Sequence, residues 1–187
     1  MGEASVAGQT SALDFLMGKV LAPGRECGEC VACCDLLYVA ELKKPARQRC
    51  PDCTGTGCGI WETRPSVCRN WHCVWRMLGA MPPETRPDRL GVMFELRSQR
   101  PARNILSKRY IRGISLGGVE NFEAPLVRKA IDMFSKARAP VWLDHNGQDV
   151  CVHPPKPIQD VLIHGLPAAS PEAAAEAEKW RFIYDPL

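Results

Sequence analysis

The sequence predicts an α+β fold: an irregular, cysteine-rich, metal-bound half with short helices, followed by a small antiparallel sheet with helices. Nine of the ten cysteines lie between Cys27 and Cys73, and alternating apolar residues with an Asn146-Gly147 pair predict strands later in the chain. The 187 residues are 45% hydrophobic and 24% charged, which excludes disordered and fibrous classes. We expect a cysteine-cluster metal-binding region over residues 1–80 and an α+β region over 81–187, packed as one continuous domain.

Apolar spacing and turn residues place the individual elements. In the first half, helices are predicted over Ser11–Leu21, Cys27–Leu42 and Pro65–Leu78, with an irregular loop over Pro45–Gly59 that a metal must organise. The second half is predicted to comprise a linker over Met81–Pro87, strands over Leu90–Leu96 and Asn104–Leu116, a helix over Phe122–Ala137, a hairpin over Val141–Val152 and a helix over Pro171–Phe182 capped by Ser170.

The expected location follows from hydropathy and cysteine use. No run of about 18 apolar residues is present to cross a membrane, and the first residues lack the basic region of a secretory signal. The net charge of +3 is too mild to demand nucleic acid or a membrane surface. We therefore expect a cytoplasmic protein, in a reducing compartment where thiols stay free to bind metal.

The cysteines fall into two groups. The first, Cys27-x-x-Cys30-x-x-Cys33-Cys34, would place several thiolates on one face of a helix, which requires a cation to hold them. The second group offers four more sulfurs, at Cys50, Cys58, Cys68 and Cys73. Two four-sulfur sites, one eight-cysteine binuclear site, or one iron–sulfur cluster of the [4Fe–4S] type with spare thiols all remain open, and so does zinc.

The series CxxCxxCC, CP, CGIW and RPxxCRxWxC, over roughly residues 27–73, resembles the YkgJ-like cysteine-cluster family, whose members are described as zinc or iron chelators. The resemblance implies eight metal ligands: Cys27, Cys30, Cys33, Cys34, Cys50, Cys58, Cys68 and Cys73. Cys53 is an addition to the family pattern, and it and His72 are additional ligand candidates. Neither the metal nor an activity follows from the resemblance.

Two further sets of residues are candidates, one as support for the metal ligands and one as a separate chelate. Four thiolates around zinc or a cluster leave a net charge near −2, and Arg64 and Arg69 are expected to offset it from positions just outside the ligands. Cys151 and His153 share one face of a strand, where a half-buried hairpin cysteine is a better interpretation than a metal chelate.

The segment between Leu96 and Val119 has no acidic residue, and it is the candidate surface for an anionic ligand or a protein partner. A solvated strand face explains it as simply. Aromatic residues there are limited to Tyr110, so nucleic acid is not favoured. Its cations are Arg97, Arg100, Arg103, Lys108, Arg109 and Arg112.

The predicted function is a metal-binding protein that holds zinc or an iron–sulfur cluster through cysteine thiolates, with a structural or redox centre. One alternative is a cofactor-dependent enzyme, an oxidoreductase or a methyltransferase-like protein, because flagellin lysine N-methylases resemble this family in their cysteine cluster. Another alternative is a zinc-dependent nucleic-acid binder. The sequence has no recognisable Ser/His/Asp or Cys/His combination that indicates a nucleophilic catalytic site, so whether the chain is an enzyme stays open.

Overall fold

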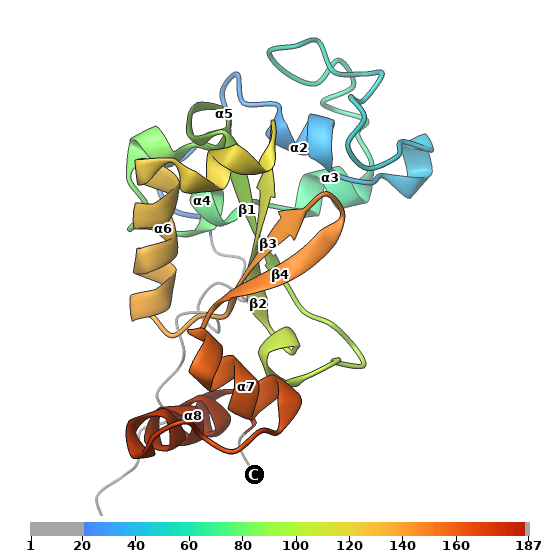
Figure 1. Ribbon diagram of the computed structural model, residues 1–187. Helices are drawn as coiled ribbons and strands as arrows, with labels where there is room; N and C mark the ends of the chain where they lie inside the picture. The colour runs from blue at the N-terminus through green and yellow to red at the C-terminus, as the bar shows by residue number, and fades with distance from the viewer. Residues whose placement is uncertain (1–20, 186–187) are drawn as a thin grey trace, which may run out of the picture.

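The computed structural model describes residues 21–185, which form an α+β fold around a four-stranded mixed sheet (Figure 1). The predicted helix over Ser11–Leu21 therefore lies, apart from Leu21, outside the described residues. The strands follow one another across the sheet in chain order: β1 (Val92–Arg97), β2 (Tyr110–Ser115), β3 (Val141–His145) and β4 (Gln148–His153).

The helices differ sharply in length between the two halves. Short ones precede the sheet: α2 (Ala32–Leu36), α3 (Ser66–Asn70), α4 (Val74–Met77) and α5 (Pro87–Leu90). Longer ones come after β2: α6 (Pro125–Lys136) lies between β2 and β3, and α7 (Lys156–His164) and α8 (Pro171–Tyr184) follow β4. Single 3₁₀ turns occupy Ala40–Leu42, Pro83–Thr85, Ile105–Ser107 and Val119–Glu123.

The sheet is mixed rather than wholly antiparallel, which corrects the prediction. Strands β1 and β2 pair antiparallel, as do β3 and β4, but β2 and β3 run parallel. A parallel pair needs a crossover connection, and α6 supplies it between these two strands. The predicted β3–β4 hairpin is confirmed, and Asn146 and Gly147 both take the positive φ angles, 54° and 91°, that its tight turn requires.

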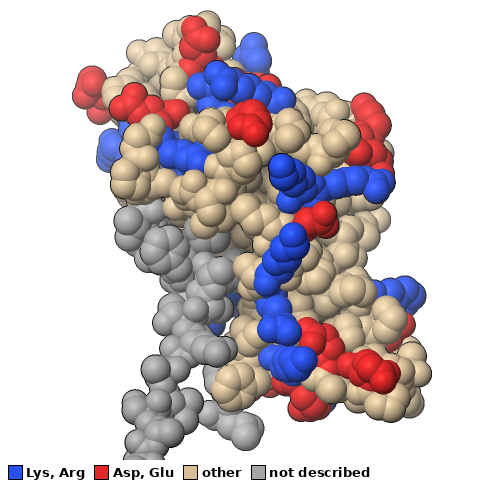
Figure 2. All heavy atoms as spheres, turned by 90° about the vertical axis from the view of Figure 1, so that its left-hand side faces the viewer, with Lys and Arg blue, Asp and Glu red and all other residues tan. Residues whose placement is uncertain are grey.

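The core lies where α6 covers the sheet. Val127, Ala130 and Phe134 form the buried stripe of α6, and the Phe134 ring meets Phe94 of β1 edge-on at 5.0 Å between centroids. Burying a side chain of this size stabilises the fold by about 1.5–3 kcal/mol. The opposite face of α6 is charged, and Figure 2, which faces this side, shows Lys and Arg interspersed with Asp and Glu. The predicted helix over Phe122–Ala137 is thus confirmed in its main part.

The cysteine-rich half and the sheet share one hydrophobic cluster. Ala32 and Leu36 of α2 and Val74 of α4 belong to the same buried set as Val92 and Met93 of β1. The segment Met81–Pro87 is not a free linker, because Met81 is only 1% exposed and Thr85 is buried with its hydroxyl donating to Pro82 O at 2.6 Å. The two segments therefore meet in this cluster, and the connection between them is anchored by buried residues on either side of the exposed Pro83 and Glu84.

Two predicted helices of the first half are shorter than expected. In Cys27–Leu42 only α2 and a single 3₁₀ turn are helical, because Gly28 takes φ +54° and the chain turns back through a hydrogen bond from Cys30 N to Cys27 O at 3.0 Å. Pro65–Leu78 is divided into α3 and α4 by extended backbone at Trp71 and Cys73. In each case the break occurs at or beside a cysteine.

In the C-terminal part, α8 begins as predicted, with Ser170 accepting a hydrogen bond from Ala173 N. Helix α7 was missed by sequence reasoning. Its signals were Pro157 in the first turn, the apolar spacing of Ile158 and Leu162, and Gly165, which ends the helix at φ +65°.

A buried ionic network joins the cysteine-rich loop to the sheet. Arg112 of β2 donates to Asp144 at 3.0 Å, to Asp149 at 2.6 Å and to the buried Glu95 at 3.3 Å. Arg47, from the loop after α2, donates to the same Asp144 carboxylate at 2.8 Å. Burial opposes ionisation of Asp144, but the bonds from Arg47 and Gly147 N and the charge of Arg112 outweigh it and lower its pKa.

Removing the Asp144 carboxylate is expected to leave two arginines without their shared partner. Asp144→Ala should lower the free energy of unfolding by about 3 kcal/mol at pH 7, measured by urea denaturation. Because the Asp144 pKa is lowered in the folded state, its contribution is complete above the unfolded pKa and is lost as pH falls below about 4. The difference between variant and wild type should therefore shrink at acid pH.

The matched control is Asp149→Ala, which removes a partner of the same Arg112 whose side chain is 28% exposed against 4% for Asp144. We expect its cost to be about 1 kcal/mol or less. Equal costs for the two variants would contradict a central role for Asp144.

Candidate metal centre

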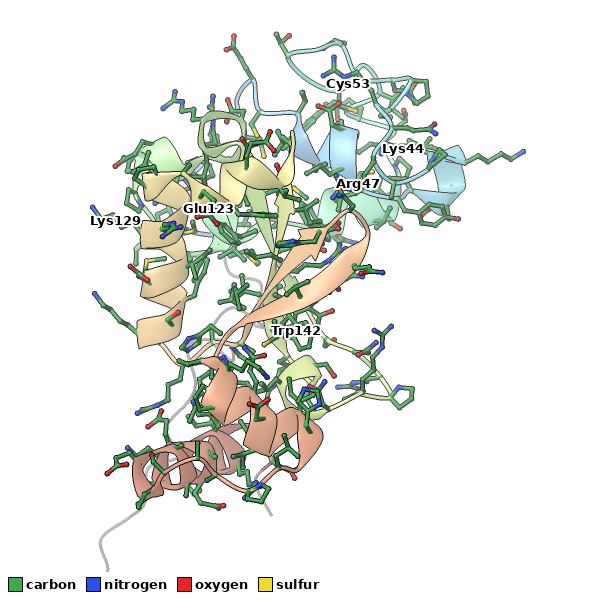
Figure 3. The ribbon with its side chains drawn as sticks, in the orientation of Figure 1. Lys44, Arg47, Cys53, Glu123, Lys129 and Trp142 are labelled. Atoms are coloured by element: carbon green, nitrogen blue, oxygen red, sulfur yellow. The ribbon has the colours of Figure 1, made fainter. Side chains whose placement is uncertain are left out.

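All eight cysteines that the motif identifies as ligands line a single cavity of about 650 Å³, called here the cysteine cavity. Its walls come from the turn before α2, from α2 itself, from the loop between residues 45 and 64, and from α3 and the residues that precede α4. His72, Arg64 and Arg69 also line it, whereas Cys53 does not. Figure 3 shows Cys53 in the loop beyond α2.

Three of these cysteines, called here the core-side group, are neighbours: Cys27, Cys30 and Cys73. Cys73 belongs to the hydrophobic cluster and Cys30 packs against it. Cys73 is buried, its electrostatic neighbours are Cys27 and Cys30, and its thiol accepts hydrogen bonds from the backbone of Trp75 and Arg76. Burial raises the pKa of Cys73 to about 11 in spite of those two donors. The site thus holds a neutral thiol until a cation stabilises the thiolate.

Cys30, the neighbour of Cys73, is held by hydrogen bonds in a similar way. Its sulfur accepts from the backbone of Ala32 and Asp88, and its thiol donates to the Asp88 carboxylate. The Asp88 carboxylate in turn accepts two hydrogen bonds from the Arg86 guanidinium, each 2.7 Å long. Burial raises the pKa of Cys30 as well.

The loop-side group consists of Cys34, Cys50, Cys53, Cys58 and Cys68. Cys50 N donates to Cys34 O at 3.0 Å, Cys53 N donates to Cys50 O at 3.1 Å, and Cys53 pairs with Cys58 in an isolated β-bridge. The Cys34 thiol is hydrogen-bonded with Cys33 and Cys53, and Cys68 interacts electrostatically with Cys34, Cys50 and Cys58. Backbone bonds thus bring these sulfurs together across the loop.

Crowding among these sulfurs disfavours thiolates when no cation is near. The neighbouring Cys33 sulfur, and then burial, raise the pKa of Cys34 far above its ordinary value. All ten cysteines are free thiols. As the side chains stand within residues 21–185, no three Cys, His, Asp or Glu residues converge closely enough to hold one metal ion.

The donor chemistry nevertheless fits a thiolate-bound metal. Zinc and iron–sulfur clusters both take cysteine sulfur, and sulfur is the ligand type that this cavity offers in quantity. Backbone N–H groups that point at Cys30 and Cys73 are the donors that stabilise metal-bound thiolates. Assembly would require the thiols to move closer than they stand.

Arg64 and Arg69 lie at the cavity wall but bind the chain around residue 61. The Arg64 guanidinium stacks on the Trp61 ring at 3.4 Å and donates to Trp61 O at 2.6 Å, and Arg69 donates to Arg64 O at 2.6 Å. The charged neighbours of the sulfurs are instead Arg49, which acts on Cys34 and Cys53, and Arg86 beside Cys30.

Sequence reasoning singled out neither Arg49 nor Arg86. Arg86 could not be found that way, because only the fold brings α5 to the first cysteine turn. Lys44 is a further cation in the cavity wall. It is 2% exposed, and its ammonium group donates to Leu37 O and to Pro45 O. It is labelled with Arg47 in Figure 3.

Cys151 is half-buried in β4, as predicted, and its thiol donates to His153 O at 3.3 Å. Burial raises its pKa to about 12. The His153 ring lies against Trp180, with 5.3 Å between centroids, rather than beside the Cys151 sulfur. This cysteine lies in the hairpin, outside the cysteine cavity.

The basic segment between Leu96 and Val119 does not form one open cationic surface. Arg112 is taken up by three carboxylates, Arg97 lies 3.6 Å from Glu95, and Lys108 pairs with Asp185. Arg100 and Arg103 are exposed in the loop after β1. Three of these cations are thus paired with carboxylates, and the anion-binding role of the segment stays a prediction.

Within residues 21–185, no helix has the length and apolar character needed to cross a membrane. Comparison of the chain with protein-family models, with curated proteins and with solved structures gives no match. The resemblance to the YkgJ-like family therefore stays a prediction from the cysteine motif alone.

Proposed function

We propose that the chain is a metal-binding protein that holds zinc or an iron–sulfur cluster through the thiolates of the cysteine cavity. One observation carries this proposal. Between residues 45 and 72 the only buried residue is Cys50, yet the segment keeps a defined path and contributes three of the eight cavity cysteines. A stretch with so little buried apolar surface needs another source of stability.

Metal–thiolate bonds are that source. In small zinc domains the apparent binding free energy is about 10–16 kcal/mol and acts as folding free energy. Cys50, Cys58 and Cys68 are spread along the unsupported segment, while Cys34 belongs to α2, which is anchored in the hydrophobic cluster by Ala32 and Leu36. A metal bound between them would fasten the segment to the core, so the proposed role of the centre is structural at the least.

When bound, zinc would supply a closed, redox-inactive crosslink, and an iron–sulfur cluster would add one-electron chemistry. The residues of this chain place the thiols, donate N–H bonds to Cys30 and Cys73, and supply positive charge from Arg49, Arg86 and Lys44. These groups suit either centre.

Anaerobic purification followed by metal and sulfide analysis tests the proposal. Colourless protein with stoichiometric zinc would support a structural zinc protein, and brown protein with matching iron and sulfide would support a cluster. Cys68→Ser should lower the metal content because it removes an exposed thiol of the cavity. Cys151→Ser, outside the cavity, should leave it unchanged. Anaerobic protein with neither metal would overturn the proposal.

Metal removal is expected to loosen residues 45–72 before the sheet. After chelation, trypsin should cut first after the exposed Arg49 and Arg69, because without metal this segment keeps only the Arg47–Asp144 ion pair and a few backbone hydrogen bonds to the rest of the fold. Mass spectrometry of early fragments gives the order of cleavage.

Exposed Arg128 and Lys129 serve as the internal control, because α6 is anchored by its own buried stripe. Cleavage there should be equally slow with and without metal. The same order and rate of cleavage before and after chelation would argue against a structural metal.

A further inference from the structure

The eight cavity cysteines divide by what they pack against. Cys73 belongs to the hydrophobic cluster, and the partly buried Cys30 and Cys33 pack on it. Cys34, Cys50, Cys58 and Cys68 are not part of that cluster among the described residues, and neither is the exposed Cys27. Three sulfurs therefore lie on the hydrophobic core, four lie around the irregular loop, and Cys27 is assigned by its neighbours.

Electrostatic interactions and backbone hydrogen bonds between the cysteines give the same division and place Cys27 on the core side. On the core side, Cys27 and Cys30 are joined by the turn at Gly28 and are the cysteine neighbours of Cys73. On the loop side, Cys68 has the cysteine neighbours Cys34, Cys50 and Cys58. The described interactions of Cys68 include none of the core-side sulfurs, and those of Cys73 include none of the loop-side sulfurs.

Helix α2 joins the two sets at the adjacent residues Cys33 and Cys34. Successive residues of an α-helix project about 100° apart, so these two thiols leave the helix toward different surroundings. Cys33 packs on the hydrophobic cluster with Cys30, whereas Cys34 bonds to Cys53 and, through its carbonyl, to Cys50 N. The two thiols also contact each other, so the two sets lie side by side.

We propose that the cavity holds two separate four-thiolate centres, an inference that rests on the proposed metal-binding function. Each has the four sulfurs that a closed zinc site or a [4Fe–4S] cluster takes. The core-side centre consists of Cys27, Cys30, Cys33 and Cys73, and the loop-side centre of Cys34, Cys50, Cys58 and Cys68. Cys53 is outside both centres and bonds to the Cys34 thiol.

The surroundings give each centre its own compensating charges. Arg86 and Asp88 of the α5 region lie beside Cys30, whereas the Arg49–Asp35 pair lies beside Cys34 and Cys53. Backbone N–H donors reach Cys30 and Cys73 on the core side. We expect the core-side centre to be the more rigidly held of the two.

Cobalt titration of the full chain tests the division. Metal-free protein, reduced and kept anaerobic, is titrated with Co²⁺ while thiolate-to-cobalt charge-transfer absorption is followed. Wild type should saturate at two equivalents per chain. Cys27→Ser and Cys68→Ser form a matched pair, because both thiols are exposed and neither substitution opens a hole in the core. Each variant should saturate at one equivalent and the double variant at none.

Four further variants locate the boundary and control for folding. Cys58→Ser should behave as Cys68→Ser does, Cys151→Ser should still take two equivalents, and far-UV circular dichroism should match wild type. Cys33→Ser combined with Cys68→Ser should lose the remaining tetrahedral four-thiolate spectrum, whereas Cys33→Ser with Cys27→Ser should keep the loop-side one. The reverse pattern would contradict the assignment of Cys33 to the core-side centre.

The outcomes separate this inference from the proposed function. Saturation of wild type at one equivalent, or complete loss of binding in both Cys27→Ser and Cys68→Ser, would overturn two centres while leaving metal binding intact. Failure of wild type to bind cobalt, zinc or iron would overturn the proposed function itself.

Discussion

The structure depends on how a polar, glycine- and proline-rich segment is held against a core to which it contributes almost nothing. Residues 45–72 are bounded by Lys44 and Cys73, both buried, and between them only Cys50 is buried, while Trp71 is partly buried against the hydrophobic cluster. Backbone hydrogen bonds among cysteines, such as Cys50 N to Cys34 O, trace the path of the loop but are worth little each. Metal–thiolate bonds are therefore the interaction that would stabilise this segment, and without metal the segment lacks it.

The sheet offers one strong attachment to that segment. Arg47 reaches Asp144 at the β3–β4 end, where Arg112 already binds the same carboxylate. Burial raises the pKa of the nearby Glu95, and the charges of Arg97 and Arg112 oppose that rise without cancelling it. The carboxylates of this network therefore outnumber the buried cations that the sheet provides. Arg47, from the cysteine-rich loop, supplies an additional positive charge that stabilises the Asp144 carboxylate. Ordering of the loop and satisfaction of this network should reinforce each other.

Local signals predicted much of the second half. The buried stripe of α6, the Ser170 cap of α8 and the Asn146-Gly147 turn each act over a few residues, so the sequence was sufficient for them. The parallel pairing of β2 with β3 was missed because strand direction depends on how the α6 crossover returns, which no local pattern states.

In the candidate site, the motif selected the eight cysteines that share one cavity and set Cys53 apart from them. It misjudged the backbone, because Gly28 interrupts the helix predicted from Cys27. It did not identify Arg86 and Asp88, which meet Cys30, and the predicted role of Arg64, which lines the cavity and stacks on Trp61, stays a prediction. Those contacts join residues far apart in the sequence, and only the folded chain brings them together.

The short helix α2 explains why a compact CxxCxxCC motif need not describe a single site. On one continuous helix, Cys27, Cys30 and Cys34 would share a face and Cys33 would stand at its edge. The turn at Gly28 removes Cys27 and Cys30 from the helix and lays them toward α5 and Cys73, which leaves Cys33 and Cys34 as neighbours with different partners. A break of one residue in helical geometry thus changes a single stripe of thiols into a junction between two groups.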